Sequence, residues 1–139
     1  MKTRVSEQWL SAPDEADEFP TNGDRFAAQE LLKRSDTKSF TRRGFICQTI
    51  AVVFHKKSVS QLKKIADEVG RERMQVMHGT TDNLITFPHG EVLVEGLGGE
   101  KSGVKKVVFE GRGHYLPLEE REEFRKLIEA LVDKTEAMR

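Results

Sequence analysis

The chain has 139 residues, the length of one ordinary domain, and its 23 basic and 23 acidic side chains balance. A balanced charge gives no basic excess for binding nucleic acid or an anionic membrane surface, and no apolar run approaches the roughly 20 residues of a membrane span. The first residues lack the apolar stretch of a secretory signal, and the single cysteine, Cys47, excludes an internal disulfide. We therefore expect a soluble, cytoplasmic protein.

The first half of the chain is predicted to be helical after an irregular start. Residues 1–23 combine prolines, acids and turn formers without periodicity, which is typical of an irregular or flexible segment. Three helices are expected within residues 24–70, at about 24–33, 41–55 and 58–70. Ser58 and Gln61 have the spacing of a capping box, and Gly70 is a typical helix stop. The apolar residues expected to be buried on these helices are Phe26, Leu31, Leu32, Phe45, Ile46, Ile50, Val53, Phe54, Leu62, Ile65 and Val69.

Strand and helix patterns alternate in residues 71–139. Short apolar runs at 73–77 and 104–109 predict two strands, and a helix is expected to begin near Pro88 between them. Pro117 is expected to open the final helix, because proline suits the first helical turn. The apolar stripe of that helix is Phe124, Leu127, Ile128 and Leu131. The charged residues expected on its solvated face are Glu119, Glu120, Glu123, Arg125 and Lys126.

This order of elements favours an α/β fold with parallel strands joined by right-handed crossovers. Only two strands are predicted, whereas parallel strands are normally buried within larger sheets. The sequence therefore predicts the end of a doubly wound α/β domain. Its parts would be a helical segment followed by strand-helix-strand-helix with two parallel strands.

A carboxylate and an imidazole follow the ends of the two predicted strands. Asp82 comes after Gly79 and His114 comes after Gly113, with roughly one strand-helix-strand crossover between them. Parallel strands end at one edge of a sheet, where such side chains can converge on a crevice. In a hydrolytic triad the histidine takes a proton from the nucleophile, and the carboxylate fixes the imidazole tautomer. Taken singly, Asp82 also suits a turn cap and His114 a hydrogen-bonded loop position.

Two stretches of the second half resemble a known family. Met77–Asp82 (MHGTTD) resembles the acid-bearing turn of α/β-hydrolase-fold enzymes, and Phe109–His114 (FEGRGH) resembles the turn that presents the family's histidine. The resemblance is specific from about Met74 to the end of the chain. Residues 24–70 are more loosely similar to the family's helical cap, and Phe40–Phe45 is the closest stretch.

This resemblance implies a partial α/β-hydrolase fold, composed of the cap segment and a C-terminal segment at residues 71–139. It implies esterase-like or lipase-like acyl hydrolysis through a Ser-His-Asp triad, with Asp82 as the acid and His114 as the base. The substrate of the complete enzyme would be a small ester-like molecule, and no cofactor or metal is implied.

No nucleophile is recognisable in the sequence. The family's G-x-S-x-G elbow is absent, and no serine, at positions 6, 11, 35, 39, 58, 60 or 102, has flanking glycines in that spacing. Cys47 lies in a helical pattern and is expected to be a buried helix residue. His78 is expected to be structural, and the four histidines lack the paired spacing of a metal site.

We therefore expect the isolated chain to be the C-terminal part of a hydrolase and to be inactive by itself. The alternative is a non-catalytic remnant or interaction module, which self-associates as a homo-oligomer or complements a separate N-terminal half through an exposed strand edge.

Overall fold

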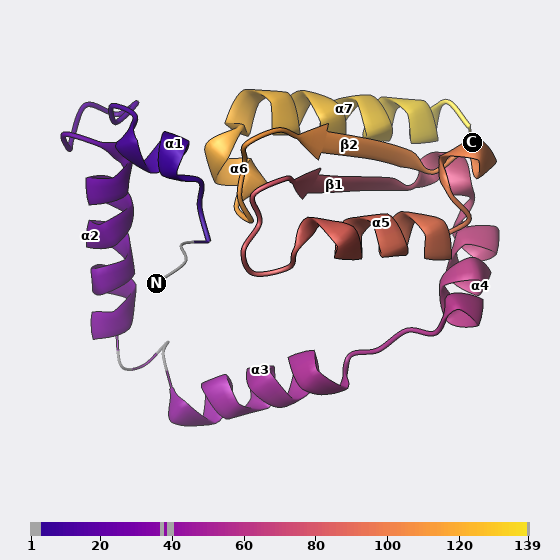
Figure 1. Cartoon of the computed structure of the whole chain (residues 1–139), viewed down its shortest axis with the longest axis horizontal. Helices are drawn as coiled ribbons and strands as arrows, with labels where there is room; N and C mark the ends of the chain where they lie inside the picture. The colour runs from indigo at the N-terminus through magenta and orange to yellow at the C-terminus, as the bar shows by residue number, and fades with distance from the viewer. Residues whose placement is uncertain (1–3, 37, 39–40, 139) are drawn as a thin grey trace. The chain divides into compact units, whose positions relative to one another are not determined.

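The computed structural model of the protein describes residues 4–36, 38 and 41–138. Contacts divide these residues into two compact units, of which one is formed by the described residues of 1–7 and 58–139 and the other by Gln8–Lys57. The protein is mixed α/β and mostly helical, with one parallel pair of strands in the first of these units (Figure 1). No helix within the described ranges combines the length and the apolar character needed to cross a membrane.

The unit of Gln8–Lys57 contains helix α2 (Asn22–Ser35) and helix α3 (Arg42–Phe54), and helix α1 (Glu7–Ser11) leads into it. Helix α1 lies within residues 1–23, where an irregular segment was expected. Irregular backbone connects α1 to α2, and it is organised by the buried carboxylate of Asp14. That carboxylate accepts amide hydrogen bonds from the loop that follows it and forms an ion pair with Arg25 at 3.0 Å.

The helix predicted at residues 41–55 is confirmed as α3, but the prediction of its burial is wrong. None of its residues is buried, Phe54 is 78% exposed, and Cys47 is exposed as well. Apolar residues lie on all sides of this helix. The spacing of apolar residues in the sequence therefore predicted a helix correctly, but it did not show which face, if any, packs against the rest of the protein. Leu31 and Leu32 of α2 are likewise exposed. Phe40, which begins the stretch most similar to the family's cap, lies outside the described residues.

Helix α4 (Val59–Val69) has the predicted limits. Ser58 and Gln61 form both hydrogen bonds of a capping box, and Gly70 ends the helix with φ +90°. Contacts place α4 with the C-terminal elements, whereas the sequence analysis grouped it with residues 24–57. Its fully buried residue is Ala66 rather than Ile65, which is partly exposed because the helix presents Ala66 to the core. The core of this unit consists of Ala66, Val94, Leu97 and Val104, with Leu62, Met74 and Val76 packed against it.

The sheet pairs β1 (Gln75–Gly79) with β2 (Lys105–Phe109) in parallel. Strand β1 begins two residues later than predicted because Arg71–Arg73 forms a turn of 3-10 helix. Helix α5 (Phe87–Gly96) connects the strands and packs against β1. A second short 3-10 helix, Glu100–Ser102, precedes β2.

The predicted final helix is in fact two helices, α6 (Leu116–Glu119) and α7 (Arg121–Glu136). Pro117 lies in the first turn of α6, as expected, but Glu120 leaves the helical conformation. The break lets the side chains of Glu119 and Glu120 turn toward the loop after β2, where they bind Gly113 and Arg112. The expectation that both carboxylates are solvated is therefore wrong for Glu119, which is buried.

Candidate functional site

Backbone hydrogen bonds tie together the two loops that follow the strands. The N–H of Thr80 donates to the carbonyl of Phe109 at 3.1 Å, which extends the parallel ladder by one bond. The N–H of Gly111 donates to the hydroxyl oxygen of Thr80 at 2.8 Å, and the N–H of Thr81 donates to the carbonyl of Arg112 at 2.9 Å. The two loops therefore form one hydrogen-bonded body at the carboxyl edge of the sheet.

Gly79 makes this close approach possible. A Cβ atom at this position would lie closer than contact distance to the carbonyl oxygens of Arg112 and Gly113. Because these are backbone atoms of the opposite loop, they could move away only by separating the two loops. The glycine after β1 is therefore required by the geometry that brings the loops together.

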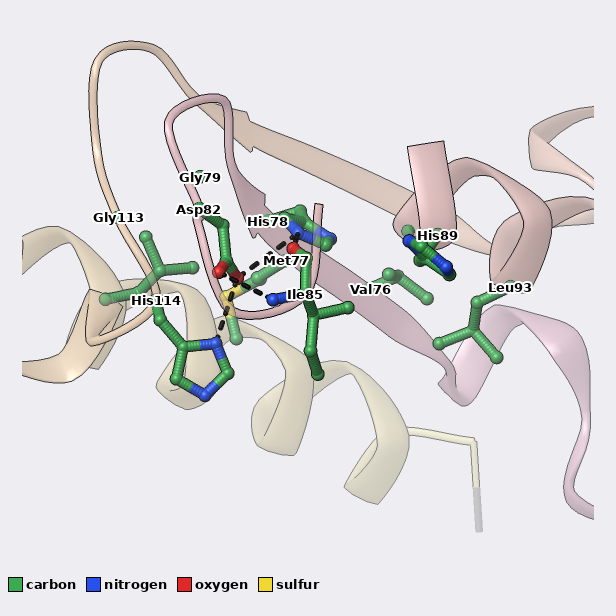
Figure 2. A pocket seen from close by; sticks show the side chains of 12 residues that line it. Val76, Met77, His78, Gly79, Asp82, Ile85, His89, Leu93, Gly113 and His114 are labelled. Carbon is green, nitrogen blue, oxygen red and sulfur yellow. Dashed lines mark hydrogen bonds and ion pairs between the residues drawn. The ribbon is translucent and has the colours of Figure 1, made fainter. Parts of the chain in front are cut away.

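Asp82 and His114, the two residues predicted from the sequence, are in direct contact (Figure 2). The Oδ2 atom of Asp82 lies 2.9 Å from Nδ1 of His114. The other carboxylate oxygen, Oδ1, accepts hydrogen bonds from the N–H groups of Leu84 at 2.8 Å and Ile85 at 2.9 Å. Asp82 is 8% exposed, so these three partners fix its carboxylate in a largely dry position.

The contact determines the tautomer of the neutral imidazole. An ionised carboxylate only accepts hydrogen bonds, so Nδ1 of His114 carries the hydrogen and, in the neutral ring, Nε2 has the lone pair. In Figure 2 the ring presents Nε2 on the side away from Asp82. Burial by itself would raise the pKa of Asp82, but the hydrogen bond from His114, the two amide donors and the charge of His114 outweigh it. The pKa of the Asp82 carboxyl is consequently below its ordinary value, and the carboxylate stays ionised.

The loop that bears His114 is held by a buried carboxylate that the sequence analysis missed. Glu119 is 7% exposed; both of its oxygens lie 3.1 Å from the N–H of Gly113, and one accepts from the N–H of Ser6 at 3.2 Å. The N–H of His114 donates to the carbonyl of Arg4 at 2.8 Å. These bonds join the N-terminal residues, the histidine loop and α6. Glu119 is one of four acids between residues 119 and 123, so only its place in the first turn after Pro117 could have distinguished it.

The other histidines have different surroundings. The Nε2 atom of His78 lies 2.8 Å from the carbonyl of Ile85 and 3.4 Å from Oδ2 of Asp82, so His78 braces the acid-bearing loop. His89 lies at the start of α5 and contacts Thr86. Among the described residues, no group of three or more His, Cys, Asp or Glu side chains is arranged to hold a metal ion.

A cavity of about 210 Å³ adjoins the Asp82–His114 pair. The residues that line it are Val76, Met77, His78, Gly79, Asp82, Ile85, His89, Gly90, Leu93, Gly113, His114 and Leu116. Its lining in the described part of the chain includes no hydroxyl or thiol side chain. The site can therefore accept a proton at His114, but its described lining offers no serine, threonine or cysteine nucleophile.

No protein-family model, curated protein or solved structure matches this chain.

The geometry of the site is that of a general base with a fixed orientation. The hydrogen bond to Asp82 holds the plane and the tautomer of His114, and it stabilises the imidazolium that forms when Nε2 takes a proton. The side chain of His114 is 30% exposed, so a reactant can reach it. Proton transfer to and from a group beside Nε2 is the reaction step that this arrangement supports.

Proposed function

We propose that this chain is the C-terminal part of an α/β-fold hydrolase that cleaves small ester-like molecules. The observation that carries the proposal is the 2.9 Å contact between Asp82 and His114 at the carboxyl ends of adjacent parallel strands. The turns that deliver these residues also resemble those of α/β-hydrolase-fold enzymes in sequence. In the complete enzyme a serine hydroxyl on a separate segment would complete the triad.

His114 moves the protons in this reaction. Its Nε2 atom accepts the proton of the serine hydroxyl as the serine oxygen bonds to the ester carbonyl carbon, and it returns the proton to the departing alcohol. Water then attacks the acyl-serine, again giving a proton to Nε2, and the proton returns to serine as the acid leaves. Asp82 stays ionised throughout and stabilises each imidazolium, in keeping with its lowered pKa.

The isolated chain is expected to be nearly silent. The cavity lining in the described residues offers no hydroxyl or thiol, and removing the nucleophile from a triad removes almost all of its contribution, several powers of ten in rate. A fluorophosphonate probe, which labels activated serines, should therefore leave the chain unlabelled.

The test uses the chain joined to the polypeptide encoded immediately upstream of it. We expect hydrolysis of a chromogenic short-chain ester together with fluorophosphonate labelling. Asp82→Asn should lower kcat by about 10⁴, and His114→Ala by at least as much. Glu123→Gln, an exposed change on α7, is the matched control. Activity that survives His114→Ala, or labelling of the isolated chain, would contradict the proposal.

A non-catalytic interaction module is the second candidate, and the exposed apolar surface of α3 favours it. Phe45, Ile50, Val53 and Phe54 are all more than half exposed, and contiguous apolar surface commonly marks an interface. This candidate predicts that association survives His114→Ala and that no esterase activity accompanies it.

A further inference from the structure

Among the described residues, the backbone groups of Gln75 and Met77 on one edge of β1 face no neighbouring strand, whereas the carbonyl of Gly79 on that edge accepts from the N–H of Asp82 at 3.3 Å. The hydrogen bond from the N–H of Lys105 to the carbonyl of Met74, at 2.9 Å, shows which residues of β1 direct their backbone groups toward β2. In this arrangement Val76 pairs with β2, whereas Gln75 and Met77 direct their N–H and C=O groups to the opposite side. Within the described residues, the sheet has no third strand to accept or donate there. This row of groups is the outer edge of β1.

The cavity beside the catalytic pair follows this outer edge. Side chains alternate between the two faces of a strand, so Val76 and His78 belong to one face and Met77 and Gly79 to the other. All four line the cavity, and no residue of β2 does. A space that touches both faces of β1 without touching β2 runs along the outer edge, and Figure 2 shows the cavity residues gathered around β1 and the loop of Asp82.

The side chain of Gln75 gives a second sign of a missing partner. Its amide nitrogen and amide oxygen are both buried, and neither has a hydrogen-bond partner in the described structure. Leaving a buried polar group unpaired costs about 1–3 kcal/mol, so such groups are rare in complete native structures. Gln75 does not line the cavity, but its backbone is part of the outer edge of β1.

The outer edge of β2 differs in ways that discourage pairing. Strand β2 carries two adjacent lysines, and Lys106 forms an ion pair with Glu91 of α5 at 2.9 Å. Lysines on an edge strand are a common means of preventing strand addition. Strand β1, with the sequence QVMHG, has no lysine, arginine or acidic residue.

We propose that the outer edge of β1 is the docking site for a parallel β-strand of a separate polypeptide, and that this polypeptide carries the nucleophile. The proposal rests on the proposed function for the identity of the partner. Strands whose faces are covered by helices are usually parallel to one another, and β1 and β2 already are. The carboxyl end of such a parallel strand would lie at the same edge of the sheet as Asp82 and His114.

The experiment measures amide hydrogen exchange in the full chain with a strand-forming peptide as the probe. The peptide is GVTTVVFEG, the sequence of residues 103–111 with both lysines replaced by threonine, because the parent sequence already pairs in parallel with β1 and lysines oppose strand addition. At millimolar peptide, exchange of the Met77 amide should slow about tenfold or more, while Val76, already bonded to β2, changes little. The same peptide with N-methyl groups on alternate residues cannot complete the ladder and should protect nothing.

Two proline substitutions form a matched pair. Met77→Pro removes an N–H that points away from β2, so the β1–β2 ladder keeps its bonds, and proline is tolerated on strand edges. This variant should weaken peptide binding at least tenfold. Val108→Pro makes the equivalent change on the outer edge of β2 and should leave binding unchanged. Exchange in the unmodified chain tests the proposal even if either variant fails to fold.

Three results would overturn the proposal. The first is no protection of Met77 at saturating peptide, and the second is protection of Val108 instead. The third is a homodimer of the free chain in which Met77 is already protected, because a second copy would then occupy the edge. The peptide carries no serine or cysteine nucleophile, so this experiment measures docking of a strand independently of ester hydrolysis. Protection of Met77 together with ester hydrolysis that survives His114→Ala would contradict the proposed function and leave the docking site standing.

Discussion

The carboxylate of Glu119 should be the most sensitive polar group of the histidine loop. The buried carboxylate of Glu119 accepts hydrogen bonds from two backbone N–H groups, those of Gly113 and Ser6. Glu119→Ala removes this acceptor from both N–H groups, and each buried donor that is left unsatisfied costs about 1–3 kcal/mol. The sum is about 2–6 kcal/mol, and water that enters the emptied space would recover part of it. We therefore expect a loss of about 2–3 kcal/mol in the free energy of unfolding, a large share of the 5–15 kcal/mol typical of a domain.

Glu119→Gln separates the hydrogen bonds from the charge. The amide keeps one accepting oxygen, but its NH₂ group opposes the other donor, so about half of the loss is expected, roughly 1–2 kcal/mol. Glu123→Ala on the exposed face of α7 is the control and should stay within about 0.5 kcal/mol of the unmodified chain. Urea unfolding followed by circular dichroism measures all three variants.

A second readout distinguishes a positioning role from a purely stabilising one. The proton on Nδ1 of His114, shared with Asp82, should give a strongly downfield NMR resonance in the unmodified chain. Glu119→Ala should broaden or remove this resonance at temperatures where the protein is still folded, because Gly113, beside His114, has lost its anchor. An unfolding free energy within 0.5 kcal/mol of the unmodified chain, with the resonance unchanged, would refute the reasoning.

Three further predictions concern the fold and the pair. Gly79→Ala should lower the free energy of unfolding by about 3 kcal/mol or more, because the added methyl group would overlap backbone atoms of the opposite loop. Gly44→Ala in α3 is the control and should change it by about 1 kcal/mol or less. Urea unfolding measures both variants. The pKa of the Asp82 carboxyl is lower in the folded chain, so the ionised carboxylate stabilises the fold fully above the ordinary pKa of about 3.9, and this stabilisation is lost as pH falls below that value. Asp82→Asn should remove this part of the acid dependence of the unfolding free energy. The downfield proton resonance of His114 should disappear over the same acid range. Ser58→Ala should lower the thermal midpoint, because it removes a helix cap worth about 1 kcal/mol.

The elements that sequence reasoning placed well are those with local signals. Ser58 and Gln61 fixed the start of α4, and the positive φ of Gly70 explains its end. The strands followed from short apolar runs, although β1 starts later because the residues before it form a 3-10 turn. Burial was predicted poorly, since helical periodicity cannot state which apolar helix finds a partner. The exposed side chains of α3 are the clearest example.

The candidate site divides in the same way. Asp82 and His114 could be found because each follows a strand and a glycine, and parallel strands bring such positions together. Glu119 could not be singled out among neighbouring acids, because its role depends on a break in the helix at Glu120. The carbonyl of Arg4 that accepts from His114 has no sequence signal at all, since any residue could supply it.

The way the pair is held bears on how a partner could complete the site. Asp82 is fixed by amides of its own loop, and His114 by Arg4 and, through Gly113, by Glu119. None of these bonds involves the backbone groups of Gln75 or Met77, so the pair is held in place without a third strand on this edge. An incoming strand would therefore not have to order the base and its carboxylate, and less of its binding energy would be lost to conformational entropy. If Met77→Pro abolished the downfield proton of His114 in the isolated, folded chain, the pair and the edge would be coupled and this independence would be wrong.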